Sequence, residues 1–166
     1  MTDDLIDRMD RWLRRNRAEY YARLRPGATV ESLAAFEERF ALELPPEFRA
    51  LYMWRDGQDS DELASLQDNR MLSSLRDIAD TKEMLDGMIG FDFDDPRWWR
   101  RGWIPFLSNG GGDHLCLDLA AEDGGEPGQV VAFWHDWEDR SVEYPSFSEW
   151  LKGLVESMEN GTLELA

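Results

Sequence analysis

Three consecutive glycines, Gly110–Gly112, constrain the fold of this chain more than any other feature of its sequence. An apolar run at 103–107 precedes them, and leucine occupies every second position from Leu115 to Leu119 after them. Leucines at this spacing lie on one face of a β-strand, and glycines let the backbone turn tightly. The sequence therefore predicts two strands of one sheet joined by a tight turn.

The same glycines raise the alternative of a phosphate-binding loop. Such a loop opens a helix whose N–H groups point at the anion, and a lysine followed by serine or threonine often completes it. Here a strand pattern follows the glycines, and no lysine is present in it. The pattern favours a turn inside a sheet over a nucleotide site.

The composition is that of one globular domain without disulfides. A chain of 166 residues can bury a single core, and 42% of its residues are hydrophobic. Cys116 is the only cysteine, which excludes an intrachain disulfide and a cysteine-based zinc cluster. No secretion signal opens the sequence, and no apolar stretch approaches the ~20 residues of a membrane span. We expect one domain over residues 1–166 and a cytoplasmic location.

The charge is strongly negative and unevenly distributed. The net charge is −17, although residues 1–25 contain seven arginines against five acidic residues. A field of this sign repels nucleic acid and anionic membranes and accelerates encounter with basic proteins. We therefore expect a basic protein partner, with no nucleic acid and no membrane. The alternative is that the acidity serves only solubility.

Apolar spacing predicts five helices around the sheet. The first spans about 2–25, is rich in arginine and ends at Pro26-Gly27; the second follows Thr29 and is interrupted at 44–46. The others are expected at 46–55, with Gly57 as a left-handed cap, from Ser74 to about 87, and from Ser146 to about 160. Residues 129–135 are apolar on both faces, which predicts a central strand covered by helices.

The sequence contains few candidates for catalysis or metal binding. His114 and His135 are the only histidines, and neither has a second ligand at a spacing typical of metal sites. Cys116 lies two residues after His114, but an acidic environment raises a thiol pKa instead of activating the thiol. A buried strand cysteine is the favoured interpretation. We expect no catalytic residue, no metal and no cofactor.

Residues 91–99 are the best candidates for recognition. Large aromatic side chains alternate with carboxylates there, a mixture that is common in protein interfaces. The expected contacts are Asp92, Asp94, Asp95, Trp98 and Trp99, with Asp56 and Asp59 as weaker candidates. Either tryptophan could equally be a core residue, because tryptophan is usually mostly buried.

Four segments, in this order, resemble a known family. They are Leu44-Pro45-Pro46-Glu47-Phe48 continuing to Asp56-Gly57, Trp103-Ile104-Pro105-Phe106 leading into 110–118, Gly128-Gln129-Val130-Val131 continuing to His135-Asp136, and Ser146-Phe147-Ser148-Glu149-Trp150-Leu151. Their order and spacing are similar to the SUKH superfamily, the Smi/Knr cell-wall-synthesis regulator family, from about residue 29 to 155. The arginine-rich helix at about 2–25 is an addition to this core.

The resemblance implies an α+β fold, a single domain in which a mostly antiparallel sheet packs against several helices. Bacterial members of the superfamily are often immunity proteins that neutralise polymorphic toxins, frequently nucleases. Fungal members regulate the synthesis of cell-wall glucan. The resemblance carries over no catalytic residue.

We therefore expect a non-enzymatic immunity protein whose acidic surface binds a basic toxin domain. The alternative is a regulatory or scaffold protein of cell-wall synthesis or signalling. A third possibility, a hydrolytic or small-molecule-binding enzyme, requires that His114, Cys116 and His135 converge in a pocket. The sequence leaves the oligomeric state open.

Overall fold

The helices begin where the sequence supplies a capping side chain. In the computed structural model, which describes residues 2–166, Thr29, Ser74 and Ser146 each accept a hydrogen bond from the backbone N–H three residues later. These bonds satisfy N–H groups that a helix start leaves unpaired, so the three predicted starts are confirmed. The helices of the described chain are α1 (Thr2–Asn16), α2 (Ala18–Arg23), α3 (Val30–Phe40), α4 (Pro46–Trp54), α5 (Leu75–Met88) and α6 (Phe147–Asn160).

The strands of residues 2–166 form one antiparallel sheet in the order β1-β2-β3-β4-β5. They are β1 (Met71–Leu72), β2 (Trp103–Ser108), β3 (His114–Asp118), β4 (Gln129–Phe133) and β5 (Val142–Tyr144). The glycine turn joins β2 to β3, which pair Ser108 with His114, and Gly110 and Gly112 both take a positive φ. The predicted turn and the predicted α+β fold are confirmed.

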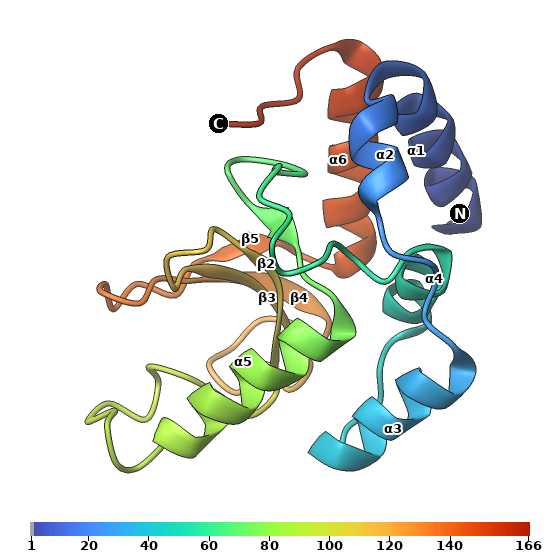
Figure 1. The fold of residues 1–166 in the computed structure, drawn as a ribbon. Coiled ribbons are helices and arrows are strands. Elements are labelled where there is room, and N and C mark those ends of the chain that lie inside the picture. Colours follow the sequence, from blue (N-terminus) through green and yellow to red (C-terminus); the bar gives the residue numbers. More distant parts are fainter. Residues whose placement is uncertain (1) are drawn as a thin grey trace.

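One face of the sheet packs against α6. Leu115, Leu117 and Val130 belong to the same core cluster as the apolar stripe of α6. The ring centroid of Phe106 lies 4.9 Å from that of Trp150 in α6, at nearly perpendicular planes. Figure 1 shows α6 extending beyond the sheet, with α1 and α2 beside it. The helices and the sheet therefore share one core.

The other face carries a smaller aromatic core. Cys116 and Phe133 point to this face and pack with Leu85 of α5. Trp99 closes the cluster: its ring centroid lies 5.4 Å from Trp103 and 5.3 Å from Phe133, both edge to face. Figure 1 shows α5 and the segment after it on this side of the sheet. Both faces are covered, as the apolar run at 129–135 predicts, although the strand itself, β4, ends at Phe133.

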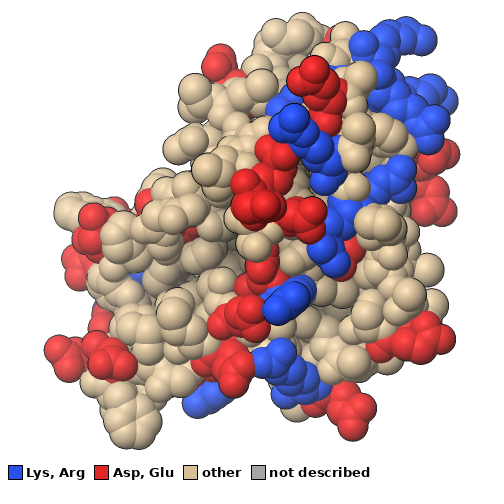
Figure 2. All heavy atoms as spheres, in the orientation of Figure 1, with Lys and Arg blue, Asp and Glu red and all other residues tan. Residues whose placement is uncertain are grey.

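The predicted first helix is broken into two, which corrects the expectation of one helix over 2–25. Arg17 leaves the helical region, with φ −138° and ψ 57°, and the chain restarts as α2. After the break, Tyr20 is buried, and its hydroxyl donates to the buried Gln58 side chain over 2.6 Å. Within residues 2–166, no helix combines the length and the apolar character needed to cross a bilayer. Figure 2 shows Lys and Arg gathered at the upper right, where Figure 1 places α1 and α2.

Candidate functional site

The expected recognition segment connects α5 to β2. Asp92 and Asp94 are exposed, Asp95 is partly exposed and Trp98 is half-buried. Trp99 is only 1% exposed, and its indole N–H donates to Asp86 in α5 over 2.8 Å. Trp99 is thus a core residue, which removes it from the set of side chains that can contact a partner.

The two weaker candidates lie elsewhere and have structural partners. The Asp56 carboxylate accepts the Leu75 N–H at the start of α5, and burial raises its pKa. Asp59 pairs with Arg25, whose guanidinium lies 2.6 Å from the carboxylate. The 91–99 segment follows the other end of α5, and a helix of 14 residues is about 20 Å long. The structure therefore does not bring these two residues to the predicted recognition segment.

Three loops enclose a surface hollow beside the 91–99 segment, which we call the acidic cleft. Its volume is about 370 Å³. It is lined by Asp95, Arg97, Trp98, Asp123, Glu138, Asp139 and Arg140. The loops before β2, after β3 and after β4 each contribute, so this site combines segments that are distant in sequence.

Arg140 holds two of these loops together. Its Nε donates to the Trp98 carbonyl over 3.1 Å, and its guanidinium carbon lies 4.7 Å from the centre of the Trp98 ring. The same guanidinium lies 4.5 Å from the centre of the Phe133 ring and donates to the Trp137 carbonyl. Cation–π contacts and hydrogen bonds of this kind fix a side chain on a rigid support. The wall formed by Trp98 is therefore anchored to the sheet.

The charge in the acidic cleft is only partly neutralised. Four carboxylates and two guanidiniums line it. Asp95 pairs with Arg97, and Asp123 pairs with Arg100. The carboxylate of Glu138, by contrast, has no ion-pair partner within residues 2–166. Uncompensated carboxylates in a hollow with an aromatic wall suit the cationic side chain of a partner.

Exposed aromatic side chains accompany the unpaired carboxylates. Trp137, in the loop after β4, is 59% exposed; Phe91, which begins the 91–99 segment, is 85% exposed but does not line the acidic cleft. The Trp137 indole N–H donates to Asp139 over 2.6 Å, which holds this ring beside the acidic cleft. Large apolar side chains left in solvent are typical of interaction surfaces. The loop after β4, residues 134–141, is not among the recognition segments predicted from the sequence, although it contains the same mixture of tryptophan and acidic residues as 91–99.

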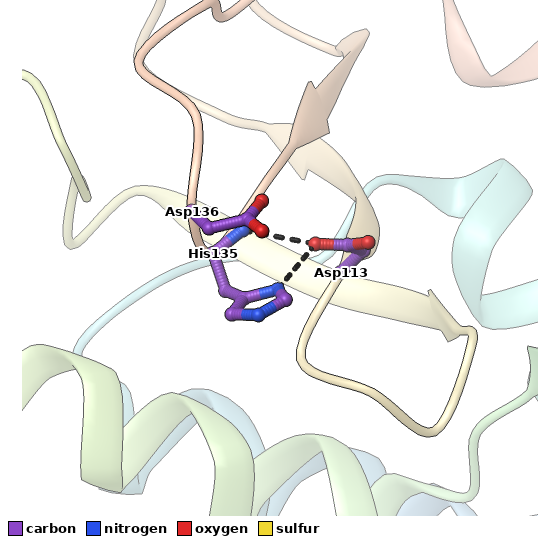
Figure 3. A group of neighbouring side chains, drawn as sticks. All are labelled: Asp113, His135 and Asp136. Atoms are coloured by element: carbon purple, nitrogen blue, oxygen red, sulfur yellow. Dashed lines mark hydrogen bonds and ion pairs between the residues drawn. The ribbon is translucent and has the colours of Figure 1, made fainter.

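Asp113, His135 and Asp136 form a second polar cluster, shown in Figure 3. One Asp113 oxygen accepts both the backbone N–H of His135 and its Nδ1–H, over 2.9 Å and 2.8 Å. The other oxygen accepts from the Asn109 amide. Ligand atoms from all three residues lie within 4.8 Å of one another, which is close enough to hold a cation. Because Asp113 already receives these bonds, its evident role is to tie the glycine turn to the end of β4.

The remaining nucleophile and base candidates are packed in the core. Cys116 is fully buried, and burial raises its thiol pKa well above the usual range. His114 is 7% exposed, whereas the side chain of His135 is 51% exposed. The three side chains therefore do not meet in a solvent-accessible pocket. This arrangement offers no activated thiolate to a substrate.

The buried imidazole of His114 is expected to make the protein acid-sensitive. Burial lowers its pKa from 6.5 to about 4. Below pH 6.5 the His114 imidazole therefore binds a proton in the unfolded chain but stays neutral in the folded chain. The free energy of unfolding falls as a result, by about 3 kcal/mol at pH 4. Urea unfolding over this pH range should show a shallower loss for His114→Phe, which cannot titrate. Equal pH slopes for the two proteins would contradict this assignment.

His135 supplies a control of opposite sign. Its hydrogen bond to Asp113 raises the pKa of the imidazole. The stabilisation that the protonated His135 gains from Asp113 is therefore complete below 6.5, the pKa of the imidazole in the unfolded chain. It is lost as the pH rises through the higher pKa of the folded chain. In urea unfolding, the free energy of unfolding of His135→Gln should therefore differ most from that of the wild type in acid and least in alkali.

Comparison with known proteins extends these observations. The model of the SMI1 / KNR4 family (SUKH-1) matches residues 27–153. A relative from Schizosaccharomyces pombe, "Cell wall biosynthesis/cell cycle regulator smi1", is 26% identical over 93% of this chain and 35% of its own length. The "Glucan synthesis regulatory protein" of Neurospora crassa is 23% identical over 93% of this chain and 38% of its own length.

A shorter match occurs with the "Cell wall assembly regulator SMI1" of Saccharomyces cerevisiae, 27% identical over 40% of this chain and 13% of that protein. This chain thus spans little more than a third of the length of the S. pombe and N. crassa relatives, which it matches over most of its own length. The family match covers everything from the loop before α3 to the middle of α6, including the loops of the acidic cleft. The chain belongs to the SMI1/KNR4 family (SUKH-1).

Proposed function

We propose that this chain is a non-enzymatic protein-binding module that regulates cell-wall synthesis or signalling by associating with a basic protein partner. The observation that carries the proposal is the acidic cleft, where unpaired carboxylates, an anchored Trp98 and the exposed Trp137 ring adjoin one another. Charge of this kind raises the association rate, and buried aromatic anchors supply most of the affinity in typical interfaces.

The regulatory role rests on the names of the relatives. Those from S. pombe, N. crassa and S. cerevisiae are named as regulators of cell-wall biosynthesis, glucan synthesis and cell-wall assembly. The absence of an activated nucleophile at Cys116 adds to the case for binding in place of catalysis.

The proposal is tested by a chimaera of the S. pombe relative in which this chain replaces the matched region. Incorporation of labelled glucose into the wall of cells lacking that relative should recover with the chimaera. The charge-reversal variant Glu138→Lys/Asp139→Lys should fail to restore it, because it places cations where the basic partner docks. Failure of the unaltered chimaera, at a normal protein level, would contradict the regulatory role.

A matched control separates the acidic cleft from net charge. Glu31 and Glu38 are exposed on α3 and have no ion-pair partner within residues 2–166. The variant Glu31→Lys/Glu38→Lys changes the net charge by the same amount as the cleft variant. It should restore wall synthesis as well as the unaltered chimaera does. Equal restoration of wall synthesis by the two charge-reversed chimaeras would show that the acidic cleft is not the surface that binds the partner.

A second candidate function is that of an immunity protein that neutralises a polymorphic toxin such as a nuclease. The net charge of −17 supports it, because a protein that cuts nucleic acid must be positive where it holds phosphate. Co-expression with a toxin encoded beside this chain's gene tests it. Protected cells and a stoichiometric complex would support the immunity role, and unprotected cells with no complex would exclude it.

A further inference from the structure

One face of α1 carries a cluster of arginines outside the family match. Arg8, Arg11 and Arg15 are three and four residues apart, so their side chains lie on the same face of the helix. The opposite face packs into the core through Leu5, Ile6, Met9 and Leu13. We call the three residues the α1 arginine cluster. It precedes residue 27, where the match to the family begins.

These arginines surround a surface hollow of about 270 Å³, which also touches Trp12, Asn16 and Glu159. Arg8 is held in place: its Nε and a terminal nitrogen contact the two Glu159 oxygens over 3.1 Å and 2.5 Å. Another terminal nitrogen of Arg8 lies 3.4 Å from Asp4. Three guanidiniums and one carboxylate line the hollow, so its lining has a net charge of +2.

Arg11 and Arg15 are left without a carboxylate. Both are exposed, and within residues 2–166 neither has an acidic oxygen inside 4.0 Å. The chain holds 35 acidic residues against 18 basic ones, so potential partners are abundant. Like charges four residues apart also destabilise a helix by a few tenths of a kcal/mol. Other exposed arginines, such as Arg76 and Arg101, also lack a carboxylate, but Arg11 and Arg15 line one hollow together with Arg8, and this convergence of three guanidiniums indicates a ligand of opposite charge.

We propose that the α1 arginine cluster binds a phosphorylated serine or threonine side chain of a protein partner. A phosphoryl group carries about −1.5 to −2 charge at pH 7, which matches the charge of the hollow, and it has three strong acceptor oxygens. The planar guanidiniums of Arg11 and Arg15 can each donate two parallel hydrogen bonds to such oxygens. Arginine clusters are a recurrent means of recognising phosphorylated segments.

Nucleic acid and anionic membranes fit this cluster less well. Both present many phosphates, and binding to them grows with the number of cations along an extended track. The cluster is a single hollow with acidic side chains at it, since Glu159 lines it and Asp4 pairs with Arg8. The remainder of the chain carries a large negative charge that would repel an extended polyanion. A short segment with one phosphate avoids that repulsion.

The test is a titration followed through the Nε–Hε NMR signals of the arginines. The probe is the peptide acetyl-Gly-Glu-phosphoSer-Glu-Gly-amide, compared with the same peptide containing serine. Saturable shifts are expected at Arg11 and Arg15 with the phosphorylated peptide only. Equal shifts with both peptides, or no saturable shift at these two arginines, would overturn the proposal. Tighter binding of a short DNA duplex at these arginines would overturn it as well.

A charge-matched pair of variants makes the test specific. Arg11→Gln/Arg15→Gln should weaken phosphopeptide binding by about tenfold or more, since two charge-assisted contacts are lost. Arg76→Gln/Arg101→Gln removes the same charge at exposed positions elsewhere and should bind as the wild type does. Equal weakening by both variants would contradict a specific site. Arg11→Gln/Arg15→Gln should leave binding at the acidic cleft unchanged. A failure of the phosphopeptide to bind is therefore distinguishable from a failure of the proposed function, which depends on the acidic cleft.

Discussion

Replacing Asp86 by alanine is expected to lower the free energy of unfolding by about 3–5 kcal/mol. Lys82, on the same helix, is 1% exposed, and its ammonium lies 3.1 Å from the Asp86 carboxylate. The other Asp86 oxygen accepts the Trp99 indole N–H. The substitution therefore leaves a buried ammonium whose one remaining hydrogen-bond partner among residues 2–166 is the Arg101 carbonyl, and it also leaves an indole without its acceptor. Urea unfolding at neutral pH measures the loss.

Two companion variants show whether the buried charge is the cause. Asp80→Ala removes an exposed carboxylate from the same helix and should change stability by less than about 0.5 kcal/mol. Lys82→Met/Asp86→Leu removes both charges and should be less destabilising than Asp86→Ala alone. A double variant as unstable as the sum of its single variants would show that the two groups do not interact.

The second large effect is expected for Gly57→Ala, with a loss of about 3–5 kcal/mol. Gly57 has φ +64°, and a Cβ atom there would lie 2.6 Å from the backbone carbonyl of Ser73. The Gly57 carbonyl accepts the Arg25 N–H, and the next N–H donates to Leu72. Three chain segments thus meet at this position, and none can move to admit a methyl group without breaking these bonds.

Gly87→Ala is the matched control for this substitution. Gly87 lies in α5, and a Cβ atom there would meet nothing within 4 Å. Alanine is the better helix former, so this variant should be more stable by roughly 0.5–1 kcal/mol. The comparison is made by thermal and urea unfolding. Similar stabilities for the two alanine variants would contradict the packing described around Gly57.

Local signals in the sequence account for most of the secondary structure. Serine and threonine caps mark three helix starts, and the glycine triplet marks the turn between β2 and β3. The break at Arg17 could not be predicted, because no glycine or proline occurs there. After the break, Tyr20 donates a buried hydrogen bond to Gln58, a contact between distant segments that local sequence does not show.

The candidate site was only partly predictable. Adjacent tryptophans at 98 and 99 are alike in sequence, and an irregular segment has no periodicity to show which one is buried. Carboxylates that cap or pair, such as Asp56, look no different in sequence from free ones such as Glu138. Glu138 reaches the acidic cleft because the segment after α5 crosses the second face of the sheet, where Trp99 packs on Phe133 and the Trp98 carbonyl accepts a hydrogen bond from Arg140.

The proposed function depends most on the acidic cleft as the surface that receives a cationic side chain of a partner protein. The direct measurement is an NMR titration of the tryptophan indole signals with the peptide acetyl-Gly-Arg-Gly-Arg-Gly-amide. Saturable shifts are expected at Trp98 and Trp137, weaker at high salt, abolished by Glu138→Lys/Asp139→Lys and retained by Glu31→Lys/Glu38→Lys. Indole shifts that are identical in the two charge-reversal variants, or that are absent at Trp98 and Trp137, would contradict it.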